Sequence, residues 1–202
     1  AQVLTTGGNG SVVLAVGGDL NVNENVVAHG SGAVTLSGSG AFALAANKQV
    51  ASTSGPLDIT VTAAASMGTS SAISTSGAGI VVETGSTLTM ANTALITSGS
   101  GVGDIILDSA GDMTLGGVSA GTGSVGLVSG GAILDGGDNH VDVLGAGVWL
   151  QASGRIGAPG TALELGPGTP AATGPALYPT EAHNVPRSPV GRRAHPDHTP
   201  AC

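Results

Sequence analysis

The stretch VGDIILDSAGDMTLGGVSAGTG, Val102–Gly123, decides the fold. Its apolar residues form three short clusters, and in the first two every second residue is apolar: Ile105/Leu107, Met113/Leu115 and Val118. A period of two is typical of β-strands with one buried face, whereas a helix would repeat every three or four residues. Gly, Asp and Ser, which are common in turns, separate the clusters. The stretch therefore predicts three short strands joined by tight corners.

The same pattern returns along most of the chain. Six complete units of 22 to 24 residues each end on Gly, and an incomplete seventh unit runs from 148 to about 165. The complete units are 11–32, 33–55, 56–79, 80–101, 102–123 and 124–147. Three strands per repeat are typical of one coil of a parallel β-helix. We predict an all-β fold, a single-stranded parallel β-helix of about seven coils.

Composition and energetics favour stacked coils. The chain has 36 Gly and only 1% aromatic residues, yet its 41% hydrophobic content exceeds that of disordered segments. About five aliphatic side chains per coil contribute roughly 1.5–3 kcal/mol each on burial, whereas ordering one coil costs roughly 1.5 kcal/mol per residue. A coil is therefore stable only between neighbours. Two alternatives are a flexible Gly/Ser linker, which would not keep aliphatic residues in register, and an open antiparallel sandwich.

The chain changes character at Gly166. Residues 166–202 contain eight of the ten prolines and show no alternation. Because proline cannot donate a hydrogen bond to a strand ladder, we expect the strands to stop here. The predicted domains are a β-helix at 1–165, a fragment of a longer solenoid, and an irregular, disordered tail at 166–202. The tail has two open explanations: a shifted reading frame or truncated gene, or a native linker or loose cap over the last coil.

Charge and hydropathy exclude several classes of partner. The net charge is −8, from 13 acidic and 5 basic residues, so no basic patch is present to bind nucleic acid. No apolar run approaches the 18 residues of a membrane span, so we expect no membrane insertion. The lone cysteine, Cys202, cannot form a disulfide framework. The opening AQVLTTGGNG has no basic segment followed by an apolar one, so the sequence resembles a mature or internal fragment.

No catalytic group is identifiable. Pectin-degrading enzymes share this architecture and need clustered carboxylates with a basic residue in one cleft, but Lys48 and Arg155 are the only basic residues of the repeat region. They lie about five coils, or roughly 24 Å, apart. Asp104 and Asp108 share a strand face with Cα atoms about 13 Å apart, beyond the roughly 5–9.5 Å between glycosidase carboxyls. We predict no enzymatic activity, no catalytic residues and no cofactor.

Two places are candidate binding sites. The acidic group LDGGDNHVDV, Leu134–Val143, contains the candidate metal ligands Asp135, Asp138 and Asp142. It lacks the glycine and aspartate spacing of the calcium-binding nonapeptide, and corner turns also use Asp, so we predict turn residues here rather than a metal site. The candidate ligand-binding residue is Trp149, which alternation directs outward. An exposed Trp can stack on a sugar or a protein partner, although it can also pack under a loop or the tail.

At GGDLNV (17–22), AGDMTLGG (110–117) and VWLQASGRIGAPGTALEL (148–165) the chain resembles the repeat region of filamentous haemagglutinin-like large exoproteins. These are bacterial surface adhesins exported by two-partner secretion. The resemblance covers about residues 1–165. It implies a right-handed β-helical fibre, export through a dedicated outer-membrane transporter, and a secreted or cell-surface location. The family's signal peptide and N-terminal secretion domain are not in this sequence, and no receptor-binding motif carries over to named residues.

The expected function is therefore that of a stalk or adhesin segment that attaches a bacterium to host cells or surfaces. Its expected partners are a host-cell or surface receptor, with a glycan as one candidate, and the outer-membrane transporter of the full-length protein. Two alternatives are a carbohydrate-active β-helix enzyme of the pectin-lyase type and the stalk of a contact-dependent toxin.

Overall fold

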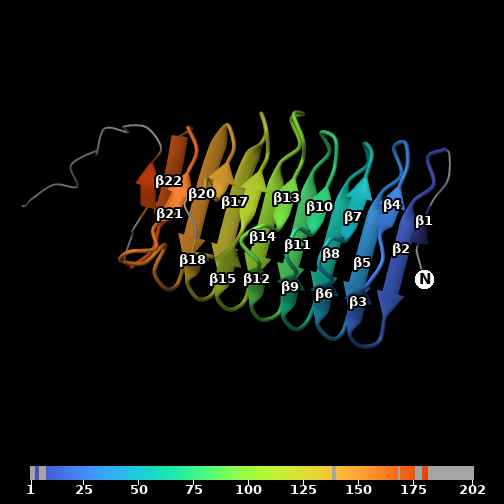
Figure 1. Ribbon diagram of the computed structural model, residues 1–202, viewed down its shortest axis with the longest axis horizontal. Helices are drawn as coiled ribbons and strands as arrows, with labels where there is room; N and C mark the ends of the chain where they lie inside the picture. Colours follow the sequence, from blue (N-terminus) through green and yellow to red (C-terminus); the bar gives the residue numbers. More distant parts are fainter. Residues whose placement is uncertain (1–2, 5–7, 138–139, 168, 176–178, 182–202) are drawn as a thin grey trace, which may run out of the picture.

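The computed structural model describes residues 3–4, 8–137, 140–167, 169–175 and 179–181. These residues form strands and turns and contain no helix. The strands build three sheets in which each strand pairs in parallel with the strand of the next coil. The coils follow one another along the long axis of the molecule from the N-terminal to the C-terminal end (Figure 1).

Each sheet takes one strand from successive coils. The nine-stranded sheet consists of β1 (Val3–Leu4), β4 (Val26–Ala28), β7 (Gln49–Ser52), β10 (Ala72–Ser74), β13 (Leu95–Thr97), β16 (Gly117–Ser119), β19 (Val143–Leu144), β21 (Leu163–Leu165) and β23 (Pro179–Glu181). The eight-stranded sheet consists of β2 (Val12–Val16), β5 (Val34–Gly38), β8 (Leu57–Val61), β11 (Ile80–Thr84), β14 (Ile105–Ser109), β17 (Ser124–Ser129), β20 (Gly147–Ala152) and β22 (Thr169–Thr173). The six-stranded sheet consists of β3 (Leu20–Val22), β6 (Phe42–Leu44), β9 (Ala65–Met67), β12 (Leu88–Met90), β15 (Met113–Leu115) and β18 (Ile133–Asp135).

The register confirms the predicted fold class. Val34 of β5 pairs with Leu57 of β8, and Leu57 pairs with Ile80 of β11, so that in these coils the equivalent residue lies 23 positions further along the chain. From β2 to β19 the chain visits the three sheets in turn, whereas β20 to β23 alternate between the eight-stranded and nine-stranded sheets only. This arrangement is a parallel β-helix, or β-solenoid, of about seven turns.

The core is one continuous column of small aliphatic side chains. In the eight-stranded sheet the inward residues stack on one another and are buried: Val34, Leu57, Ile80, Ile105, Val125 and Val148. Phe42, the only phenylalanine, pairs with Ala65 in the next coil, and both are 1% exposed. A small neighbour therefore makes room for the largest core side chain.

Aspartates at the corners bond to the next coil. The Oδ1 atoms of Asp19, Asp104 and Asp112 accept hydrogen bonds of 2.7 to 2.8 Å from the backbone N–H groups of Ala41, Ser124 and Ala132, respectively. In each case donor and acceptor lie about one repeat apart. The repeated Gly-Asp pairs of the sequence therefore satisfy backbone donors where the strands end.

Steric contacts require glycine at another corner of the coil. Gly99 and Gly121 occupy the same position in successive coils and have φ angles of 69° and 59°. A Cβ atom on Gly121 would overlap the carbonyl oxygen of Gly99. Only glycine combines this backbone conformation with such close stacking.

The expectation that strands stop at Gly166 is wrong. Strand β22 pairs with β20, and β23 pairs with β21, so that the ladders continue to Glu181. Both strands are the last of their sheets, and Pro179 is the first residue of β23. A proline at a strand start or on an edge strand removes no ladder bond that a further neighbour would need. The rest of the expected tail, 182–202, lies outside the described residues.

Candidate functional site

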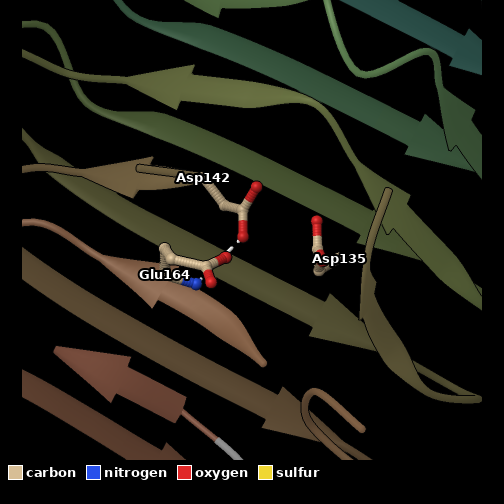
Figure 2. Close-up of side chains that lie close together, drawn as sticks. All are labelled: Asp135, Asp142 and Glu164. Carbon is tan, nitrogen blue, oxygen red and sulfur yellow. Dashed lines mark hydrogen bonds between the residues drawn. The ribbon is translucent and has the colours of Figure 1, made fainter. Parts of the chain in front are cut away.

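Three carboxylates from two successive coils meet at one corner of the β-helix. Asp135 is the last residue of β18, Asp142 immediately precedes β19, and Glu164 is the middle residue of β21. Val143 pairs with Leu165, so Asp142 lies beside Glu164 of the next coil. One carboxylate oxygen from each residue lies within 4.8 Å of the other two. Figure 2 shows the three carboxyl groups gathered between the ribbons.

Backbone hydrogen bonds hold two of these side chains in place. The N–H of Glu164 donates to Asp142 Oδ2 at 2.9 Å, and the N–H of Asp142 donates to the Glu164 carbonyl at 2.9 Å. The N–H of Gly137 donates to Asp135 Oδ1 at 2.8 Å. One oxygen of each aspartate thus accepts a backbone hydrogen bond. The second oxygen, Oδ2 of Asp135 or Oδ1 of Asp142, is buried and has no hydrogen-bond partner among the described residues.

The electrostatic environment of Asp142 opposes ionisation. The residue is 0% exposed, and burial is the largest cause that raises its pKa, to about 8. The adjacent Glu164 carboxyl group and the negative charges of Asp135 and Glu164 raise the pKa further, whereas the hydrogen bond from the Glu164 N–H lowers it. Without a nearby cation, Asp142 therefore holds a proton around neutral pH.

The structure brings together two of the three candidate metal ligands. Asp135 and Asp142 belong to the cluster, and Asp138 lies outside the described residues. Glu164 was not predicted as a ligand from the sequence. It lies 22 residues after Asp142, one repeat further along, so the repeat period was the signal that could have identified it.

Trp149 lies on the outer face of the eight-stranded sheet, as predicted, and is 43% exposed. Its register partner in the preceding coil is Gly126, and a Cβ atom there would lie 3.8 Å from Trp149 Cε3. The indole therefore lies next to the space that Gly126 leaves open. Together with Ile106, which is 47% exposed, these residues line a shallow apolar hollow.

The structure also places the other charged residues named from the sequence. Asp104 is bonded to the Ser124 N–H, and Asp108 is exposed and pairs in register with Glu83. Lys48 forms an ion pair of 3.0 Å with Glu24, and this contact lowers the pKa of Glu24. The pair is partly exposed to solvent, so it contributes little to stability.

Comparisons with protein-family models, with curated proteins and with solved structures found no match. Within the described part of the chain there is no helix of the length and apolar character needed to cross a lipid bilayer.

Proposed function

We propose that the chain is a stalk or adhesin segment of a bacterial exoprotein that is secreted or displayed at the cell surface, where it mediates attachment to host cells or surfaces. Export through an outer-membrane transporter belongs to this proposal. So does a receptor that contacts the surface around Trp149, with a glycan as one candidate ligand.

The observation that carries the proposal is the regular stacking of the coils. One hydrophobic core runs from Val12 to Leu165, and the pairing repeats in all three sheets. At ~4.8 Å per coil, about seven coils span roughly 34 Å. Every coil contacts mainly its two neighbours, so such a rod extends by adding repeats without redesign of the core. This geometry suits a spacer that holds binding surfaces away from a cell.

Trp149 supplies a contact surface on this rod. A half-exposed indole beside an open glycine position can stack its face on a sugar ring or receive an apolar side chain of a partner. Trp is also among the residues most often responsible for binding energy in interfaces. Asp104 lines the same hollow and adds polar character at its rim.

The test is adhesion of beads coated with the purified chain to cultured epithelial cells, together with binding to a glycan array. We expect the wild-type chain to bind and Trp149→Ala to reduce binding by about tenfold or more, as for the loss of an interface anchor. Val13→Ala is the matched control, because Val13 is 68% exposed on the same sheet near the other end. Absence of binding by the wild-type chain, or equal binding by Trp149→Ala, would contradict the assignment of this surface.

The two alternatives give different results. A pectin-lyase-type enzyme would release unsaturated products from polygalacturonate, which a stalk would not. A toxin carrier would share the rod but inhibit neighbouring bacteria through a further domain of the parent protein. Antibody labelling of intact cells of the source organism tests surface display, and labelling only after lysis would contradict it.

A further inference from the structure

We propose that Asp135, Asp142 and Glu164 bind one calcium ion that ties the coil containing β18 and β19 to the coil containing β21. This site goes beyond the proposed adhesion function and does not depend on it.

The Asp142 carboxyl group has a buried oxygen without a hydrogen-bond partner among the described residues. The side chain is 0% exposed, and its Oδ1 atom has no hydrogen-bond partner within the described ranges. Asp135 repeats the arrangement, since Oδ1 is held by the Gly137 N–H while Oδ2 is buried without a partner. A buried carboxylate oxygen without a donor is costly, and a bound cation removes that cost. Figure 2 shows both carboxyl groups beside that of Glu164.

The negative charge of the three carboxylates also favours a bound cation. Three carboxylates lie together, and the basic residues in the described part of the chain are Lys48 and Arg155. Lys48 is paired with Glu24 in the N-terminal half, and neither Asp135 nor Asp142 forms an ion pair with a described residue. A divalent cation would supply the missing positive charge.

The spacing and the chemical type of the ligand atoms favour Ca²⁺. Two oxygens bound to one ion can be separated by at most twice the metal–oxygen distance, which is roughly 4.6–5.2 Å for Ca²⁺ and about 4.0–4.2 Å for Mg²⁺. The carboxylate oxygens lie within 4.8 Å of one another, a span that Ca²⁺ can bridge as the side chains stand. The ligand set contains oxygen only, whereas Zn²⁺ favours nitrogen and sulfur. The nearby His140 instead lines a second surface hollow, together with Leu95 and Leu144.

A backbone hydrogen bond orients the Asp142 carboxyl group for binding the ion. The Glu164 N–H fixes one oxygen of Asp142 and leaves the other free to bind, so the aspartate needs little reorganisation. Ca²⁺ takes six to eight oxygen ligands, and water or backbone carbonyls would complete its shell. With three carboxylates we expect a dissociation constant of about 10⁻⁴–10⁻³ M, the range of extracellular calcium modules.

The test is calorimetric titration of the full chain, stripped of metal, with CaCl2 and in parallel with MgCl2. We expect one Ca²⁺ per chain, a higher Tm with Ca²⁺, and Mg²⁺ binding at least about tenfold weaker. Asp142→Asn and Glu164→Gln should each weaken Ca²⁺ binding by about tenfold or more. Asp108→Asn is the matched control, because Asp108 also faces a carboxylate of the neighbouring coil, Glu83, but is exposed.

Asn and Gln keep the size of the side chains they replace, and far-UV circular dichroism in chelator verifies that each variant folds. Several outcomes would overturn the proposal: no Ca²⁺ binding by the wild-type chain at about 10 mM, well above the expected range; unchanged binding by both folded variants; or Mg²⁺ binding as tight as that of Ca²⁺. None of these measurements involves adhesion, so failure of the calcium site and failure of the proposed function are distinguishable.

Discussion

Burial makes ionisation of Asp142 costly in the folded chain. In the unfolded chain its pKa returns to about 3.8, whereas in the folded chain without metal it is about 8. Between these values the folded state binds a proton that the unfolded state has released. The stabilising contribution is therefore fully present below pH 3.8 and is lost as the pH rises toward 8.

We predict that the metal-free chain becomes less stable as the pH rises from about 5 to about 8, by at most about 1.4 kcal/mol per pH unit from this group. Asp142→Asn should flatten this dependence, because an amide does not titrate. The measurement is Tm by circular dichroism in chelator at several pH values, with Asp108→Asn as control. Stability that rises across this window, or an unchanged slope in Asp142→Asn, would contradict the prediction.

Strand β14 shows how alternation separates core from surface within one element. Leu107 is 0% exposed and stacks between Val82 and Leu127, whereas its neighbour Ile106 is 47% exposed on the outer face. Removing the Leu107 side chain would leave a cavity inside a column that cannot collapse around it. Removing the Ile106 side chain would change only the surface.

We predict that Leu107→Ala lowers the free energy of unfolding by about 2–5 kcal/mol, whereas Ile106→Ala changes it by less than about 1 kcal/mol. Equilibrium denaturation in urea measures both variants. Similar losses for the two would mean that the inward and outward faces of β14 are assigned incorrectly.

Stability should vary along the whole solenoid. Strands β8 and β11 have a paired neighbour on both sides, whereas β2 and β22 are the end strands of the same sheet. In a quasi-one-dimensional fold, end coils open more readily because they lose contacts to one neighbour only.

We predict that backbone amides of β8 and β11 exchange at least about tenfold more slowly than those of β2 and β22. Hydrogen exchange followed by mass spectrometry of peptides from each strand measures this difference. Uniform exchange along the sheet would indicate that the chain opens as a single cooperative unit.

The limits of prediction from the sequence have specific causes. Strand β9 lies where the apolar signal is faint, because Ala65 must be small beside Phe42. Strand β22 contains Pro170, which argues against a strand unless its edge position is known. Glu164 is one repeat away from Asp142, and a single glutamate in a strand has no local pattern that indicates a ligand.

The sequence by itself determined the solenoid, since alternation, corner residues and a repeat of 22 to 24 residues are all local signals that recur along the chain. It also placed Trp149 on the surface, because alternation within one strand determines the face. Only the tertiary structure decided how far the ladders extend and which carboxylates meet. Those features depend on the register between coils and on the burial of Asp142, and both arise from contacts between residues far apart in sequence.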